Sequence, residues 1–120
     1  MNIEEFIKTH IESLDELRAL LLFHAHAEMR RTADEVAGKL YILPEAAARL
    51  LARLTAKGFL AADGEPAYYR FQPQTAELAE LIRELADLDR KRPVTLIKMI
   101  YERPPGIQAF ADAFKIKKET

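Results

Sequence analysis

The sequence predicts a mainly α-helical protein with one small β-hairpin and a helical extension at the C-terminal end. Apolar residues recur at the three- and four-residue spacing of amphipathic helices along most of the chain. Ser or Thr stands before three of these stretches, where a hydroxyl can cap a helix. A Phe- and Tyr-rich stretch surrounds an Asp-Gly pair, which is typical of a hairpin turn. These three observations together indicate the fold class.

Length and composition exclude several classes of protein. The chain has 120 residues, enough for one domain, and a formal net charge of −1, which argues against a generally cationic coat for nucleic acid. It has no cysteine, so disulfides, thiol nucleophiles and cysteine-bound zinc are excluded. No uncharged run approaches the roughly 20 residues that cross a membrane, and the first residues, MNIEEFIK, lack the apolar core of a signal peptide. We therefore expect a cytoplasmic protein without membrane contact.

Two helices are predicted at the start of the chain. Residues 1–12 place their isoleucines and Phe6 on one stripe, which favours a short helix. Ser13 and Glu16 have the spacing of a capping box, and the leucines that follow extend a second helix to near Met29.

Two further helices and a hairpin follow. Thr32 and Glu35 repeat the capping-box spacing ahead of a short helix. Pro44 suits the first position of the next helix, where its missing N–H costs nothing, and Gly58 can end that helix in a left-handed conformation. Residues 59–71, with the Asp-Gly turn inside them, are predicted to form two short strands.

Two helices are predicted after the hairpin. Thr75 can cap a long helix that continues to about Arg92, and Pro93 starts another that continues to Tyr101. A Pro-Pro-Gly sequence then stops the helical pattern. A last short amphipathic stretch and a basic tail are carried by Ile107, Phe110, Phe114, Lys115, Lys117 and Lys118.

The order of these elements resembles a known arrangement. The stretch TADEVAGKLYILPEAAARLLARLTAKGFL (residues 32–60) has the spacing of a winged helix-turn-helix, and the hairpin continues the likeness to about Phe71. It is similar to bacterial regulators of the MarR and ArsR groups. The resemblance implies a winged domain over residues 1–72 and a C-terminal helical extension over residues 73–120. It also implies a DNA-binding transcriptional regulator that is not an enzyme.

The resemblance further implies where duplex DNA is bound. In such folds the helix over residues 44–57 is the recognition helix, and its N-terminal residues face the major groove. Arg49, Arg53 and Lys57 lie on one helical face at i, i+4 and i+8. We expect them to contact phosphates together with Arg70 of the wing. The alternative for the three helical cations is an ordinary solvated surface.

Several residues depart from the family pattern. Tyr41 stands where glycine is usual in the turn between the helices, and Leu43 stands where Ser or Thr usually caps the recognition helix. The front of that helix offers Glu45 and three alanines, although base edges are mostly read by hydrogen-bonding side chains. The wing tip, residues 63–66, is acidic.

These departures favour an alternative function. The chain would then be a winged-helix module that binds a protein partner and never binds DNA. A weakly charged face of small residues suits packing against another helix. That face consists of Ala46, Ala48 and Ala52.

The long helix after the wing is predicted to make a homodimer. Such a helix is a common dimerisation element in similar regulators. Its apolar stripe consists of Leu78, Leu81, Ile82, Leu85 and Leu88. The alternative is that the stripe folds back over its own domain together with the helix over residues 94–101. A two-fold dimer would place two recognition helices about one DNA turn apart.

No constellation of catalytic residues is present, and we expect no enzyme activity, no cofactor and no metal. His24 and His26 are two residues apart, so on a helix they point about 200° away from each other. The four glycines lack the spacing of a phosphate-binding loop. The resemblance implies room for a small effector between the domain and the C-terminal helices, with candidate residues His24, Tyr41, Tyr101 and Arg103.

Overall fold

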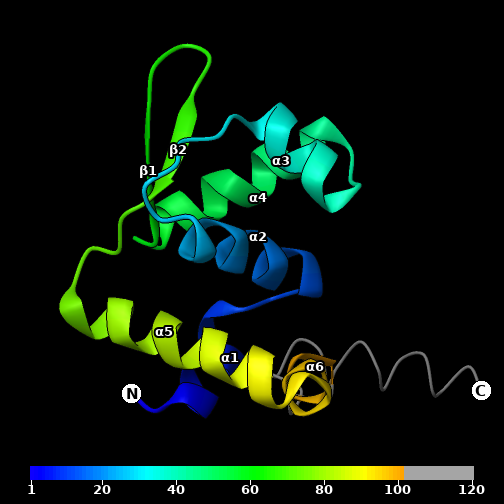
Figure 1. Cartoon of the computed structure of the whole chain (residues 1–120), viewed down its shortest axis with the longest axis vertical. Helices are drawn as coiled ribbons and strands as arrows, with labels where there is room; N and C mark the ends of the chain where they lie inside the picture. Colours follow the sequence, from blue (N-terminus) through cyan, green and yellow to red (C-terminus); the bar gives the residue numbers. More distant parts are fainter. Residues whose placement is uncertain (102–120) are drawn as a thin grey trace, which may run out of the picture.

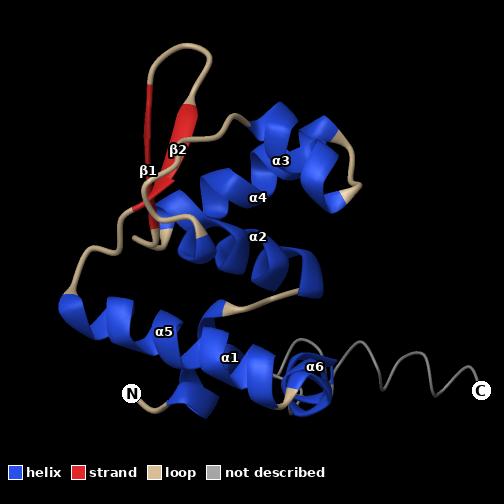
Figure 2. Cartoon of the chain, viewed as in Figure 1, coloured by secondary structure: helices blue, strands red, loops and turns tan. Residues whose placement is uncertain are grey.

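Six helices and one two-stranded antiparallel hairpin form residues 1–101, which are the residues that this computed structural model describes (Figure 1, Figure 2). In chain order the elements are α1 (Ile3–His10), α2 (Leu14–Ala25), α3 (Ala33–Leu40), α4 (Pro44–Ala56), β1 (Leu60–Asp63), β2 (Tyr68–Phe71), α5 (Ala76–Lys91) and α6 (Pro93–Tyr101). The predicted class, mainly α-helical with a small hairpin wing, is confirmed. The predictions for Arg103, for the amphipathic stretch at 107–114 and for the basic tail lie outside the described residues.

Side-chain caps start the helices where the sequence predicts them. The Ser13 hydroxyl accepts a hydrogen bond from the backbone amide three residues later, at 3.1 Å. Thr32 takes part in a complete capping box at α3, and Thr75 caps α5. Pro44 occupies the first turn of α4, as predicted. Asn2 adds a capping box at α1 that the sequence analysis missed.

α2 is shorter than predicted. It ends at Ala25 rather than near Met29. The chain that follows joins the hairpin, where the amide of Arg31 donates to the carbonyl of Tyr69 at 2.9 Å and its carbonyl accepts from the Tyr69 amide at 2.8 Å. The backbone leaves the helical conformation at His26, with φ −129° and ψ 60°, and the amide of Met29 donates to the carbonyl of His26 at 2.9 Å in the turn that leads to this bridge.

The hairpin forms the wing at the end of the molecule opposite α1, α5 and α6 (Figure 1). Its register pairs Leu60 with Phe71 at the base and Asp63 with Tyr68 at the tip. Gly58, which precedes it, has a φ of +86° and ends α4 as predicted. A Cβ at this glycine would lie 2.6 Å from the side-chain oxygen of Gln74, which would have to move aside, so the positive φ is the main reason for glycine here.

One hydrophobic core runs through both halves of the chain. α2 packs against α3, α4 and α5, and α1 packs against α5 and α6. The ring of Phe6 on α1 lies 5.6 Å from the ring of Phe59, which precedes the wing. α1 therefore bridges the winged part and the C-terminal helices, and the core is continuous across the expected boundary between residues 72 and 73.

The apolar stripe of α5 lies inside this core. Leu81, Ile82 and Leu85 are buried within the single chain, while Leu78 and Leu88 are partly buried against the same core. A side chain that is already covered has no surface left for a second copy. The alternative of a stripe that folds back over its own domain therefore describes Leu81, Ile82 and Leu85, whereas a dimer contact that involves the partly buried Leu78 and Leu88 stays a prediction.

Candidate nucleic-acid interface

α4 presents its predicted cations to three different environments. Arg49 is exposed, Arg53 is 48% exposed, and Lys57 is only 16% exposed. Because an α-helix has 3.6 residues per turn, each i+4 step rotates a side chain by about 40° around the helix. From Arg49 to Lys57 the side chains therefore rotate from solvent toward α2. Only Arg49 and Arg53 remain on the outer surface.

Lys57 is held by groups of its own chain. Its ammonium donates to a carboxylate oxygen of Glu16 at 2.9 Å and to the carbonyl of His10 at 2.5 Å. The carboxylate of Glu12 is a further ion-pair partner at 3.6 Å. A phosphate would have to displace these partners, so the predicted phosphate contact of Lys57 is corrected to an internal one.

His10 lies beside this polar cluster, with its ring 5.2 Å from that of Phe6 and 5.8 Å from that of Phe59. Burial against these rings lowers the pKa of His10 below its ordinary value. The positive charge of Lys57 lowers this pKa further, and the carboxylate of Glu16 opposes the shift. The imidazole ring therefore favours its neutral form in the folded protein.

Two cations meet the wing tip, Arg70 from the wing itself and Arg30 from the connection between α2 and α3. Arg70 is an ion-pair partner of Asp63 at 3.4 Å, and Arg30 reaches the other oxygen of the same carboxylate at 2.6 Å. The guanidinium of Arg30 also lies 5.4 Å from the centre of the Tyr68 ring. The sequence analysis missed Arg30 because it placed this stretch at the end of a helix. The acidity predicted for the wing tip is thus partly neutralised.

Arg31 places another charge beneath the wing. Its side chain is buried, and its Nε has no hydrogen-bond partner among residues 1–101. One terminal nitrogen lies 3.8 Å from the sulfur of Met29. Buried polar groups are normally hydrogen-bonded, so the Nε of Arg31 is an exception to that rule. No signal in the sequence distinguished Arg31 from its neighbour.

A hollow of about 400 Å³ separates the wing tip from α3 and α4. Ala48, one of the alanines at the front of α4, lines it. The charged side chains at its edge are Asp34 and Glu65, so this part of the surface repels phosphate. The cations described above lie outside this hollow.

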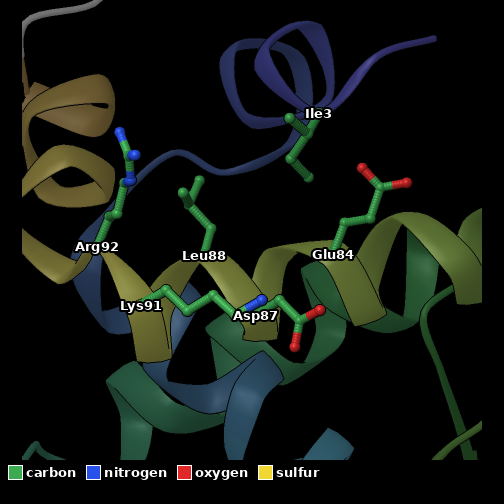
Figure 3. A pocket seen from close by; sticks show the side chains of 6 residues that line it. All are labelled: Ile3, Glu84, Asp87, Leu88, Lys91 and Arg92. Atoms are coloured by element: carbon green, nitrogen blue, oxygen red, sulfur yellow. The ribbon is translucent and has the colours of Figure 1, made fainter.

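Two other hollows lie near the C-terminal helices. One, of about 260 Å³, separates α1 from α5, with Ile3 and Leu88 facing each other across it and charged residues of α5 along its edge (Figure 3). The other, of about 380 Å³, is lined mainly by leucines of α2, with Arg18, Lys39 and Asp89 as its charged members.

The residues expected to hold a small effector are not brought together. The ring of His24 packs edge-on against that of Phe71, at 5.4 Å. Tyr41 and Tyr101 are exposed, and neither lines the hollows described above. Arg103 lies outside the described residues. The prediction that these residues line one effector pocket is therefore wrong for His24, Tyr41 and Tyr101.

Within residues 1–101 no three His, Cys, Asp or Glu side chains are grouped so that they could bind a metal ion. No helix of this range combines the length and the apolar character that a membrane span requires.

Comparison with solved structures identifies the fold. Over 98% of this chain, it is similar to the oxidized form of MarR from E. coli, with 17% sequence identity, a TM-score of 0.55 and coverage of 81% of that chain. A MarR family protein from Bacillus stearothermophilus matches with 15% identity and a TM-score of 0.54, covering 98% of this chain and 78% of that chain. No family model and no curated protein matches the sequence.

A third similar structure contains DNA. It is a mutant MarR from E. coli complexed with operator DNA, with 16% identity, a TM-score of 0.55 and coverage of 98% of this chain and 81% of that chain. The fold of this chain is therefore the winged helix of MarR-type transcriptional regulators, as the spacing of residues 32–60 predicts. Sequence identities of 15–17% show a shared fold. The function has to be inferred from the residues of the candidate site.

Proposed function

We propose that this chain is a transcriptional regulator that binds duplex DNA with α4 in the major groove and the wing on the neighbouring backbone. The observation that carries the proposal is the placement of cations on and beside both elements: Arg49 and Arg53 are exposed on α4, Arg70 is half-buried on the wing, and Arg30 is exposed in the neighbouring α2–α3 connection. The operator complex of a MarR with a similar fold supports DNA binding as the function. The expected cytoplasmic and bacterial setting stays a prediction.

The cations act on phosphates rather than on bases. Arg49 faces solvent without competition from an acidic partner among the ion pairs of the described residues, and Arg53 lies 3.7 Å from the carboxylate of Glu16. Arg70 is shared with Asp63 and can exchange that partner for a phosphate. Three or four such contacts predict a slope of about −3 for log K against log salt concentration.

The test is fluorescence anisotropy with a labelled duplex from the region upstream of the coding sequence, compared with a scrambled duplex at about 50 and 200 mM salt. We expect tighter, salt-dependent binding to the native duplex. Arg49→Ala combined with Arg53→Ala should abolish binding. The matched control is Arg83→Ala combined with Arg90→Ala, which removes the same charge from the exposed face of α5.

Two results would contradict this proposal. Equal affinity of the Arg49/Arg53 variant and the parent would show that DNA does not use this face of α4. Absence of binding to either duplex at low salt would overturn DNA binding and favour the module that binds a protein partner.

We also propose that two copies of the chain associate as a homodimer. Because the centre of the α5 stripe is internal, we assign the main contact to α6, which offers an exposed apolar stripe at i, i+3 and i+7: Val94, Ile97 and Tyr101. Exposed apolar groups that line up on one helix favour a protein contact. The two α4 helices of such a dimer can then enter successive major grooves on one side of the DNA.

A further inference from the structure

Glu16 is a buried carboxylate at the junction of three helices. It lies in the first turn of α2, and none of its surface reaches solvent. One of its oxygens accepts a hydrogen bond from the backbone amide of Glu12 at 2.7 Å, and the other accepts from Lys57 at 2.9 Å. A buried charge is retained only when it is paired and hydrogen-bonded, and Glu16 meets both conditions.

Lys57 connects this carboxylate to two further elements. It is the C-cap residue of α4, and the same ammonium donates to the carbonyl of His10, the last residue of α1. One side chain therefore ties the end of α4 to both α1 and α2. This polar attachment is directional, unlike the apolar contacts that surround it.

Because α4 is a rigid helix, the position of its C-terminal end at Lys57 determines where its N-terminal end lies. The helix has 13 residues and is about 20 Å long. A tilt of roughly 5° about the Lys57 end would move the front of the helix by about 2 Å, which is enough to break a phosphate contact. Arg49 lies in that front half of α4.

We propose that the Glu16–Lys57 pair sets the orientation in which α4 meets DNA. Lys57 is then a positioning residue and not a phosphate contact. This inference rests on the proposed function, because it concerns the same DNA-binding helix. It extends that function by assigning a DNA-binding effect to Glu16, which lies in a different helix and cannot touch the ligand.

Arg53 lies 3.7 Å from the same carboxylate oxygen of Glu16, so the parent and both Glu→Gln variants are compared in an Arg53→Ala background that retains Arg49. In that background Glu16→Gln separates the two roles of Lys57 by the sign of its effect. The change removes the charge and keeps a similar shape. If Lys57 orients α4, affinity for the labelled upstream duplex falls about tenfold and the salt slope stays that of the parent. If Lys57 is instead free to bind phosphate once released, affinity rises and the slope steepens by about 1, which overturns the proposal.

Glu12→Gln is the matched control. It makes the same chemical change at an exposed carboxylate 3.6 Å from the same ammonium. It should leave the affinity within about twofold of the parent, because it alters the net charge equally without opening the buried pair. An equal loss of affinity in both variants would mean that the loss does not require opening the buried Glu16–Lys57 pair, and would also overturn the proposal.

Amide hydrogen exchange without DNA gives a second readout. The amides of Lys57 and Phe59 are bonded to carbonyls of α4, at 3.0 Å each, and should exchange about tenfold faster in Glu16→Gln. The amide of Val36 in α3 should not change, which distinguishes local release from general unfolding. Unchanged exchange at Lys57 and Phe59 would overturn the anchoring.

The two proposals fail in different ways. If the parent binds no duplex while Glu16→Gln still releases these amides, DNA binding is overturned and the anchoring stands.

If Glu16→Gln does not fold, the double variant Glu16→Met with Lys57→Met replaces the pair by apolar groups of similar length. An unchanged salt slope in that variant supports the positioning role, and a slope shallower by about 1 overturns it.

Discussion

Tyr41 stands out at the scale of single residues. It is the one non-glycine residue of positive φ among residues 1–101, with φ 59° and ψ 46°, and it is 90% exposed. Its amide still closes the last turn of α3 onto the carbonyl of Ala37. A left-handed backbone costs an ordinary residue about 1–2 kcal/mol, and a side chain in solvent regains little of that cost.

We expect Tyr41→Gly to raise the free energy of unfolding by about 0.5–1 kcal/mol. Relief of the backbone strain is partly offset by the greater entropy that glycine loses on folding. The midpoint of urea unfolding measures the effect. Leu43→Gly is the control, because Leu43 is also exposed but has an extended backbone with φ −70°. Equal losses of stability in both variants would refute the assignment of strain to Tyr41.

His10 makes the stability depend on pH. Its pKa in the folded protein lies below the ordinary value of 6.5, first because of burial and then because of Lys57. Between the two pKa values the unfolded chain therefore binds more protons, and stability falls as the pH drops through 6.5 toward the folded pKa. Glu16 reduces this effect without reversing it.

The corresponding experiment compares urea unfolding at pH 7.5 and 5.5. The parent should lose stability at the lower pH, and His10→Gln should lose less, because it has no imidazole to protonate. His24 and His26 are common to both proteins, so their contributions cancel in the difference. The same loss in parent and variant would exclude His10 as the source.

α5 is a core element at the scale of secondary structure. Leu85 is wholly buried, whereas Arg83, two residues earlier, is exposed and forms ion pairs with Glu80 and Asp87 on the outer face. Exposed pairs of this kind contribute little to stability. The apolar face of α5 therefore dominates its contribution to the fold.

Leu85→Ala should lower the free energy of unfolding by about 2–5 kcal/mol, since it leaves a cavity in the core. Leu43→Ala makes the same change at an exposed position away from the proposed dimer stripe and should change stability by less than about 0.5 kcal/mol. Chemical denaturation followed by circular dichroism measures both. A small loss of stability for Leu85→Ala with an unchanged dimer would contradict the internal role of α5. The double variant Leu81→Lys with Leu85→Lys should unfold the chain, because it places two charges in the core.

Assembly belongs to the scale of the whole molecule. Sedimentation should give the parent twice the 13.7 kDa mass of one chain. Val94→Lys combined with Ile97→Lys should give a folded monomer, because both side chains are exposed in the single chain and charges would face each other across the seam. Thr95→Lys, on the same helix but off the stripe, should remain dimeric. A monomeric parent would refute the homodimer.

Local rules were sufficient for most of the architecture. The caps at Ser13, Thr32 and Thr75 and the left-handed end at Gly58 depend on residues within a few positions of each other, so the sequence specifies them directly. The apolar stripes likewise predict which face of each helix is buried. The end of α2 was wrong because it depends on Tyr69, far along the chain.

The sequence by itself determined the order of helices and wing, and hence the likeness to MarR-type regulators, because capping and periodicity are short-range properties. Only the tertiary structure decided what individual charges and stripes contact. In the folded chain Lys57 pairs with Glu16 and Arg30 pairs with Asp63. The chain's own helices cover the centre of the α5 stripe. A side chain's partner depends on which elements lie beside it, and no spacing along the chain contains that information.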